Sequence, residues 1–160
     1  MLVTPLVEHA ADCDFLLALA SRVKDRIASF SGLDWGPIHG DATLDNLHIT
    51  ADGEVILFDF DSGGPGWRAA DLQGWTVLSE EYREKGDAFR SGYSRVRPLN
   101  EVDIKAAPLF LFAWDIWGMK IDLQNRILSR GEEPVQAYLR DQLAQLRARD
   151  ALFPWSQYGI

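Results

Sequence analysis

The sequence predicts an α+β domain that is mostly α, with a small β-hairpin in its first half. Two observations predict this class. In residues 12–30 of the 160-residue chain, apolar residues recur at three- and four-residue spacing, which is typical of a helix with one buried face, and the chain from residue 68 onward also reads as helical. Only residues 47–58 read as two short apolar strands separated by a turn. Because the chain is long enough for one hydrophobic core and short for two, we expect a single domain over residues 1–160.

The first expected element is an amphipathic helix over Asp12–Phe30, whose apolar residues lie on one face. The hairpin follows, with strands at Leu47–Thr50 and Glu54–Phe58 and a turn that contains Gly53. The rest of the chain reads as helical, and Asn100 is a suitable N-cap for the longest helix. The helices expected there cover residues 68–78, 80–93, 101–130 and 134–150.

Composition sets limits on location and partners. There is no run of about eighteen apolar residues that could cross a membrane, and the amino terminus lacks the basic segment of a secretory signal. Cys13 is the single cysteine, so no internal disulfide is possible and a reducing, cytoplasmic compartment is expected. The net charge of −8 and the lack of a Lys/Arg-rich block disfavour nucleic acid. We therefore expect neither a nucleic-acid nor a membrane partner.

The residues suited to chemistry gather in two loops that flank the hairpin. His39-Gly40-Asp41 is followed by Asn46, and Asp59-Phe60-Asp61 comes directly after the second strand. Protein kinases have H-R-D with an asparagine five residues beyond the aspartate, and then a metal-binding aspartate on the next loop. Transfer of a phosphoryl group needs a carboxylate that accepts the proton of the attacking hydroxyl, a role that suits Asp41. It also needs hard oxygen ligands for Mg²⁺, which Asn46 and Asp59 can supply.

Residues 36–72 resemble the catalytic region of the aminoglycoside phosphotransferase and choline kinase-like family. Members of this family have H-G-D in place of H-R-D and tend to have D-x-D in the second loop. They carry a further aspartate in the following helix, here Asp71, which would tie the catalytic loop down by hydrogen bonds. The resemblance implies a protein-kinase-like C-terminal lobe, with catalytic and metal loops at 36–72 and a helical substrate subdomain at 73–160. It also implies transfer of a phosphoryl group from ATP, with Mg²⁺, to a hydroxyl group of a small molecule.

The resemblance implies a role for each residue of the two loops. Asp41 and His39 belong to the catalytic loop, Asp41 as the base and His39 as a brace for the loop. Asn46 and Asp59 would hold the nucleotide through magnesium, and Asp61 would support the second metal ion or the substrate. Taken alone, such aspartates would read as turn and cap residues. Their joint occurrence at these spacings outweighs that interpretation.

Two further features have competing interpretations. The Gly-rich run at 62–66 lacks the pattern of a phosphate-binding loop, and we expect a tight connection there instead of an activation loop. Trp114, Asp115 and Trp117 fall on the helix expected at 101–130. They could form a substrate pocket that holds an ammonium group by cation–π attraction. Alternatively, the two tryptophans could simply pack in the helical core.

A complete kinase has a β-rich nucleotide lobe before the catalytic loop, and the 38 residues that precede His39 contain no such pattern. We therefore expect the N-terminal nucleotide lobe to be absent. A separate polypeptide could supply it, or the chain could be a truncated fragment or a catalytically inactive, kinase-derived binding module. A metal-dependent phosphohydrolase is a further alternative. The face around Asp41, Asp59 and the first helix is expected to expose an apolar patch or to form a homodimer.

Overall fold

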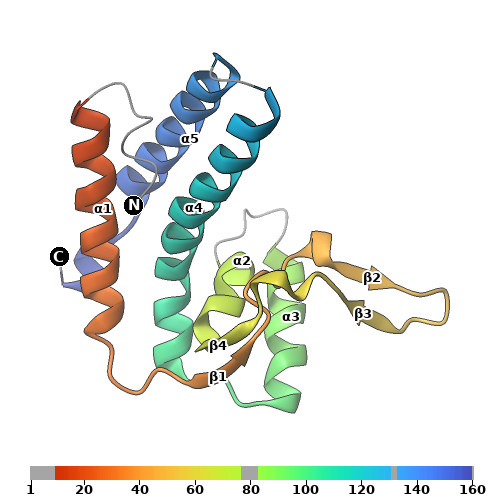
Figure 1. The fold of residues 1–160 in the computed structure, drawn as a ribbon. Helices are drawn as coiled ribbons and strands as arrows, with labels where there is room; N and C mark the ends of the chain where they lie inside the picture. Colours follow the sequence, from red (N-terminus) through yellow and green to blue (C-terminus); the bar gives the residue numbers. More distant parts are fainter. Residues whose placement is uncertain (1–9, 77–82, 131–132, 160) are drawn as a thin grey trace. The chain divides into compact units, whose positions relative to one another are not determined.

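The structure, a computed structural model, describes residues 10–76, 83–130 and 133–159. It is mostly helical with small antiparallel sheets, which confirms the expected α+β class (Figure 1). Contacts within the chain divide it into two compact units, residues 29–111 and residues 1–28 together with 112–160. The longest helix, α4 (Glu101–Arg130), belongs to the first unit up to Leu111 and to the second unit beyond it. The single domain expected over residues 1–160 stays a prediction.

The unit of residues 1–28 and 112–160 is built from helices. It contains α1 (Ala10–Ala28), the later part of α4, α5 (Glu133–Leu152) and the short 3₁₀ helix η6 (Trp155–Tyr158). The apolar residues of α1 that recur at helical spacing are buried, as the periodicity predicted. The buried apolar side chains of this unit are Leu16, Leu19, Val23, Ile27, Phe112, Met119, Leu123, Val135, Leu139, Leu143, Leu146 and Tyr158.

The helices predicted over residues 12–30, 101–130 and 134–150 agree with the structure to within a few residues. Helix α4 covers the predicted residues 101–130, and Asn100 caps it as expected. The side-chain Oδ1 of Asn100 accepts a hydrogen bond from the Asp103 N–H at 2.6 Å, which satisfies an otherwise unpaired amide of the first turn. Gly131, which precedes the last helix, lies outside the described residues. In the described part of the chain, no helix is long and apolar enough to cross a membrane.

The unit of residues 29–111 carries both small sheets. Strands β2 (Leu47–Ile49) and β3 (Val55–Leu57) form the predicted hairpin. Strands β1 (Trp35–Ile38) and β4 (Gly64–Trp67) pair antiparallel in a second ribbon. This ribbon corrects the expectation that residues 62–66 are only a loop. The expectation was wrong because β1 and β4 are held by pairing with a distant segment and not by any local apolar alternation.

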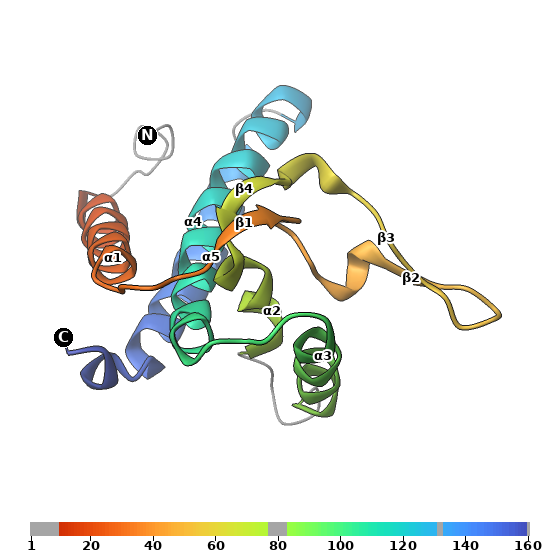
Figure 2. The same cartoon turned by 90° about the horizontal axis from the view of Figure 1, so that it is seen from below.

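The register of the two ribbons brings the candidate loops together. Ile38 at the end of β1 lies opposite Gly64 at the start of β4, so the first loop begins where the second loop ends. Leu47 at the start of β2 lies opposite Leu57 at the end of β3, so the same loops also meet at the hairpin. Each loop is therefore bounded by both ribbons, and the hairpin extends away from β1 and β4 (Figures 1 and 2).

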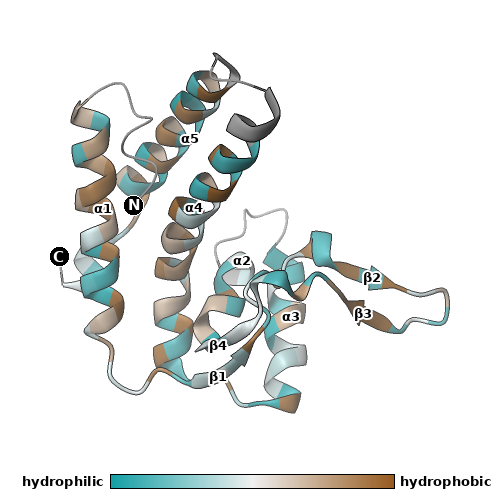
Figure 3. Cartoon of the chain, in the orientation of Figure 1, coloured by the Kyte–Doolittle hydropathy of each residue, from teal (hydrophilic) through white to brown (hydrophobic). Residues whose placement is uncertain are grey.

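Large apolar side chains are exposed along the hairpin and both loops. Figure 3 shows the apolar character of the two hairpin strands. Isolated two-stranded hairpins are marginally stable in water, so this surface is of the kind that another layer covers. The exposed apolar residues are Leu44, Ile49, Val55, Ile56, Phe58 and Phe60.

Three short helical elements support the loops from the chain that follows β4. The 3₁₀ helix η4 (Arg68–Leu72) leads into α2 (Gln73–Thr76), where one continuous helix over 68–78 was predicted. Helix α3 (Arg83–Val96) corresponds to the predicted helix 80–93. Residues 77–82, which include the predicted end of one helix and the start of the next, lie outside the described residues. The buried apolar side chains of this unit are Ala69, Leu72, Trp75, Ala106, Ala107, Leu109 and Phe110.

Polar contacts fix the start of β1. The Arg68 guanidinium donates to Oδ1 of Asp34 at 3.0 Å, and the Asp34 main-chain N–H donates to Oδ1 of Asp103, also at 3.0 Å. Gly36 lies beneath the arginine, and a Cβ atom there would lie 1.9 Å from an Arg68 nitrogen, so a side chain at this position would displace the end of the Arg68 side chain. Asp103 is buried, and this desolvation raises the pKa of its carboxyl group.

Candidate active site

The carboxylate of Asp71 holds the start of the first loop. Its Oδ2 accepts the main-chain N–H of His39 at 2.9 Å, and its Oδ1 accepts that of Gly40 at 2.8 Å. Both carboxylate oxygens are therefore used on two consecutive amides. Hydrogen bonds from main-chain amides to a charged acceptor are stronger than bonds between neutral groups. The contact fixes the backbone immediately before Asp41.

The imidazole of His39 connects the two loops. Its Nδ1 accepts the main-chain N–H of Asp41 at 3.2 Å, and its Nε2 lies 2.9 Å from the carbonyl oxygen of Phe58. Both contacts are satisfied by the neutral tautomer whose hydrogen is on Nε2. The ring is buried and lies against Phe60, with the ring centroids 4.4 Å apart. With both ring nitrogens used in this way, His39 orients the backbone of the two aspartate-bearing segments.

Asn46 is held directly on Asp41. The side-chain Nδ2 of Asn46 donates to both the main-chain carbonyl and Oδ2 of Asp41, each at 2.9 Å. Asn46 is buried and Asp41 is half-buried. Since Nδ2 faces Asp41, the amide oxygen of Asn46 is directed to the other side of the amide group. The arrangement orients one oxygen of Asp41 and leaves a carboxylate oxygen of Asp41 and an amide oxygen of Asn46 as acceptors.

Gly40 allows the two loops to approach closely. Its φ angle is +81°, in the region that favours glycine, and a Cβ atom at this position would lie 2.3 Å from the main-chain oxygen of Ser62. Any side chain at residue 40 would therefore push the second loop away. The glycine of the H-G-D sequence is explained here by both conformation and space. Ser62 was not predicted as part of the site, because its contact is made by main-chain atoms.

Asp59 has an unusual backbone conformation. Its φ and ψ angles are 62° and 63°, and it is the one non-glycine residue with positive φ in the described part of the chain. Aspartate tolerates the left-handed region better than most residues, although not without cost. The main-chain N–H of Phe58 donates to the Asn46 carbonyl at 3.1 Å, which holds the start of this loop beside the first loop. Backbone strain of this kind is often found at functional sites.

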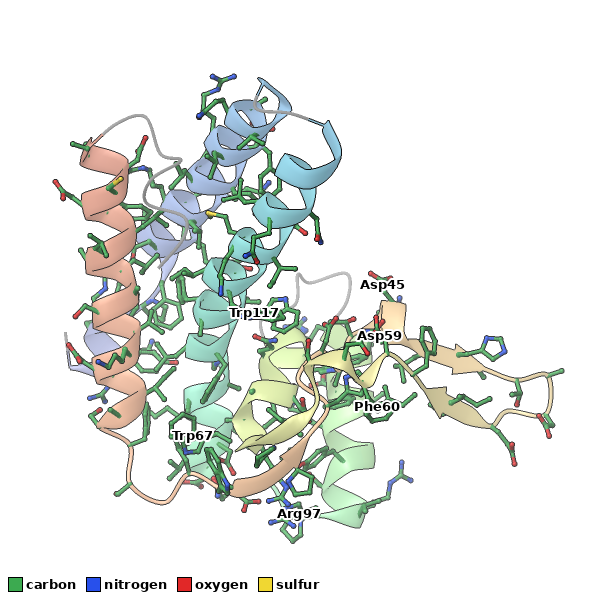
Figure 4. The ribbon with its side chains drawn as sticks, viewed as in Figure 1. Asp45, Asp59, Phe60, Trp67, Arg97 and Trp117 are labelled. Carbon is green, nitrogen blue, oxygen red and sulfur yellow. The ribbon has the colours of Figure 1, made fainter. Side chains whose placement is uncertain are left out.

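The predicted metal ligands lie on the exposed side of the loops. Asp59 and Asp61 are exposed, and Figure 4 shows Asp59 at the same end of the hairpin as Asp45. Among the residues that the structure describes, no group of three or more His, Cys, Asp or Glu side chains is arranged to hold a metal ion. The predicted set differs in kind, since it combines two carboxylates with the amide oxygen of Asn46. Such hard oxygen donors suit Mg²⁺, which keeps several water ligands in proteins.

The predicted substrate residues belong to the unit of residues 1–28 and 112–160. Asp115 forms an ion pair with Arg149. Trp114 and Trp117 contact each other with ring centroids 4.9 Å apart; Trp114 is half-buried and Trp117 is exposed. An ammonium group would have to compete with Arg149 for the carboxylate of Asp115. The predicted pocket for a cation therefore stays a prediction, and the ion pair weighs against its simplest form.

The contact of Trp75 with the first loop was not predicted. Its indole Nε1–H donates to the main-chain carbonyl of Ala42 at 2.6 Å. One signal in the sequence could have identified it: Trp75 follows Asp71 by four positions, and residues so spaced lie on the same side of a helical segment. Asp71 holds the loop before Asp41, and Trp75 contacts it after Asp41. The two side chains therefore come from adjacent turns.

Comparison with known proteins identifies a family for this chain. Residues 4–99 match the model of the phosphotransferase enzyme family, a range that contains both loops. The resemblance noted for residues 36–72 is thereby confirmed. No solved structure shows significant similarity to the chain.

Two curated relatives are longer than this chain. An uncharacterised protein of Deinococcus radiodurans is 40% identical over 112 residues, which cover 65% of this chain and 33% of the relative. An uncharacterised protein of Synechocystis is 32% identical over 153 residues, which cover 91% of this chain and 42% of the relative. The chain thus spans less than half the length of either relative.

Proposed function

This chain belongs to the phosphotransferase enzyme family, and from that premise we propose that it transfers a phosphoryl group from ATP, with Mg²⁺, to a hydroxyl group of a small molecule. The observation that carries the proposal is the pair of hydrogen bonds from Asn46 to Asp41. They join the expected base to an expected metal ligand through one buried amide group. A turn aspartate with no further task would be solvated and would need no such partner.

Asp41 is the proposed base. One carboxylate oxygen is oriented by Asn46, and the other can accept the proton of an attacking hydroxyl as the new phosphate ester bond forms. His39 holds the main-chain N–H of Asp41 and is a positioning residue in this proposal. The proton goes to Asp41 because the two ring nitrogens of His39 already have partners within the protein.

Asn46, Asp59 and Asp61 are the proposed metal ligands. The fit rests on the chemistry of the donor set, two exposed carboxylates and one amide oxygen that the bond to Asp41 turns away from the base. When bound there, Mg²⁺ would neutralise charge on the phosphates of the nucleotide. The protein's own contribution is to hold Asp59 in the left-handed conformation at the end of β3, beside the main chain of Asn46.

A nucleotide lobe is the proposed partner of the exposed apolar surface. The side chains of Leu44, Phe58 and Phe60 are exposed on the two loops, and Ile56 continues this surface on the hairpin. Covering them would remove apolar area from water at about 25 cal/mol per Å². The covering layer could come from a separate polypeptide or from a second copy of this chain. A cytoplasmic location is also part of the proposal.

Calorimetric titration with Mg²⁺-ATP tests this function. Asp59→Asn is the variant of choice, because asparagine also tolerates the left-handed conformation but removes the charge. Asp14→Asn is the matched control, since Asp14 is an exposed aspartate on α1. We expect binding by the wild-type chain and the control, with the affinity reduced about tenfold or more in Asp59→Asn.

Binding that survives Asp59→Asn unchanged would contradict the assignment of the metal ligands. Lack of binding at millimolar nucleotide, by a chain shown to be folded, would favour the alternative of an inactive binding module or a fragment. If binding is observed, a screen of hydroxyl-bearing acceptors with detection of ADP follows.

A further inference from the structure

We propose that Trp75 is a positioning residue that fixes the catalytic loop through the carbonyl group of Ala42 and couples this loop to helix α3. The inference rests on the proposed function in one respect, since the loop that is fixed carries the proposed base, Asp41. The contacts of Trp75 themselves do not depend on any bound ligand.

The first observation is the hydrogen bond itself. The indole Nε1–H of Trp75 donates to the Ala42 carbonyl at 2.6 Å, and Ala42 directly follows Asp41. The carbonyl of Asp41 accepts bonds from the Thr43 N–H at 2.9 Å and from Asn46 at 2.9 Å. Two successive peptide carbonyls after the base are therefore held in place. Without Trp75, the second of them would lose its partner and the turn could change conformation.

The second observation is that the indole ring of Trp75 packs against helix α3. Trp75 is buried and stacks on Phe89 of α3, with ring centroids 4.3 Å apart and planes 2° from parallel. Its main-chain carbonyl also accepts a hydrogen bond from the Arg90 guanidinium at 3.3 Å. Rotation of the indole ring would break its stacking on Phe89. A shift of α3 that moved Phe89 would therefore act through this ring on the peptide next to Asp41.

A buried tryptophan must place its N–H on some acceptor, so a satisfied core residue is the competing interpretation. The two interpretations differ in what the bond does. A core tryptophan contributes to global stability, and its loss affects all exchange-protected amides that open by global unfolding. A positioning tryptophan affects the amides of one loop first, because that loop opens locally.

Hydrogen exchange measured by NMR distinguishes a core role of Trp75 from a positioning role. Trp75→Phe keeps an aromatic ring for Phe89 and removes the donor. We expect the amides of Thr43 and Asn46, whose bonds close the loop, to exchange about tenfold faster. The amides of His39 and Gly40, which Asp71 holds, should keep their rates and serve as internal references.

Two further variants complete the test. Trp155→Phe is the matched control, because Trp155 also donates its indole N–H to acceptors of Asp150, in the other unit, and its loss should leave Thr43 and Asn46 unchanged. Phe89→Leu keeps the donor and removes the stacking ring, and it should accelerate exchange at the same two amides by a smaller factor. If Trp75→Phe does not fold, exchange in Phe89→Leu decides whether Trp75 positions the loop.

Unchanged exchange at Thr43 and Asn46 in Trp75→Phe, or equal acceleration at His39 and Gly40, would overturn the proposal. A second arm measures ADP release from Mg²⁺-ATP with water as acceptor. In Trp75→Phe, kcat should fall about 10- to 100-fold while KM for ATP is unchanged, since displacement of a base affects the chemical step. If the wild-type chain releases no ADP to water, the kinetic arm does not bear on transfer to a hydroxyl acceptor, and the exchange data alone decide the role of Trp75.

Discussion

The two loops of the candidate site are held in different ways. The catalytic loop, residues 39–46, is tied by the side chains of Asp71 and Trp75 and by its own His39 and Asn46. The second loop, residues 58–63, is held by main-chain bonds and by the His39 ring at the Phe58 carbonyl, and it exposes the side chains of its two aspartates. The position of Asp41, the proposed base, is thus set by contacts within the fold. Of the proposed metal ligands, Asn46 is held in the same way, whereas Asp59 and Asp61 lie on a loop that contains one residue in the left-handed conformation.

This difference is consistent with the chemistry of the two tasks. A general base must be aligned with its hydroxyl before the reaction, so misplacement is costly. A magnesium ion keeps several water ligands in proteins and is bound by only one or two carboxylates, which agrees with carboxylates that are exposed to solvent. In the proposed function a further layer would cover the exposed apolar surface of these loops, whereas the contacts that hold Asp41 all lie within residues 29–111.

The largest effect is expected when the base is removed. Asp41→Asn should lower the rate of phosphoryl transfer about 100- to 10,000-fold, since amides do not accept the hydroxyl proton. The stability should change little, because the new amide oxygen can still accept the Asn46 bond. Turnover with an identified acceptor checks this, with Asp45→Asn as an exposed neighbouring control. Retained activity in Asp41→Asn would show that Asp41 is a turn residue only.

A large effect on stability is expected at the clamp of the catalytic loop. Asp71→Asn has one acceptor oxygen for two amides and turns an NH₂ group toward the other amide. The free energy of unfolding should fall by about 2–3 kcal/mol, as measured by urea titration. Asp87→Asn, which loses only an exposed ion pair with Arg90, should change it by less than about 0.5 kcal/mol. Equal effects of the two substitutions would mean that the hydrogen bonds to Asp71 stabilise the folded state no more than an exposed ion pair does.

A smaller effect is expected from the backbone strain of the second loop. At Asp59, glycine accepts a φ of 62° freely, whereas alanine does not. Asp59→Gly should therefore be more stable than Asp59→Ala by about 1–2 kcal/mol, measured by the midpoints of urea unfolding. If alanine is the more stable of the two, the left-handed conformation is not adopted in solution.

The smallest effect is expected at the anchor of β1, through pH. Burial raises the pKa of Asp103 above its ordinary value of 3.8, so the folded state binds the proton more tightly than the unfolded state. The charged form consequently costs stability above the raised pKa, and this cost disappears as the pH falls toward 3.8.

Asp103→Asn keeps an acceptor for the Asp34 N–H and removes the charge. It should be more stable than the wild type at pH 7 by less than about 1 kcal/mol, and the difference should shrink as the pH falls. Urea unfolding at several pH values measures both curves. A difference that is constant with pH would exclude the ionisation of Asp103 as its cause.

Local patterns in the sequence were sufficient for much of the fold. The spacing of apolar residues predicted α1 and α4, and Asn100 caps the latter as expected. Two short apolar runs separated by a glycine turn predicted the hairpin of β2 and β3. These elements are determined by residues that are close in sequence, so their signals are local.

The sequence by itself also determined which residues could do chemistry, because H-G-D, Asn46 and D-F-D have a fixed order and spacing. Only the tertiary structure decided how they are held. The pairing of β1 with β4, the approach of Gly40 to Ser62 and the bond from Trp75 to Ala42 each join segments that lie far apart in the chain. Such contacts depend on the summed geometry of all the intervening elements, and no local pattern of residues encodes that sum.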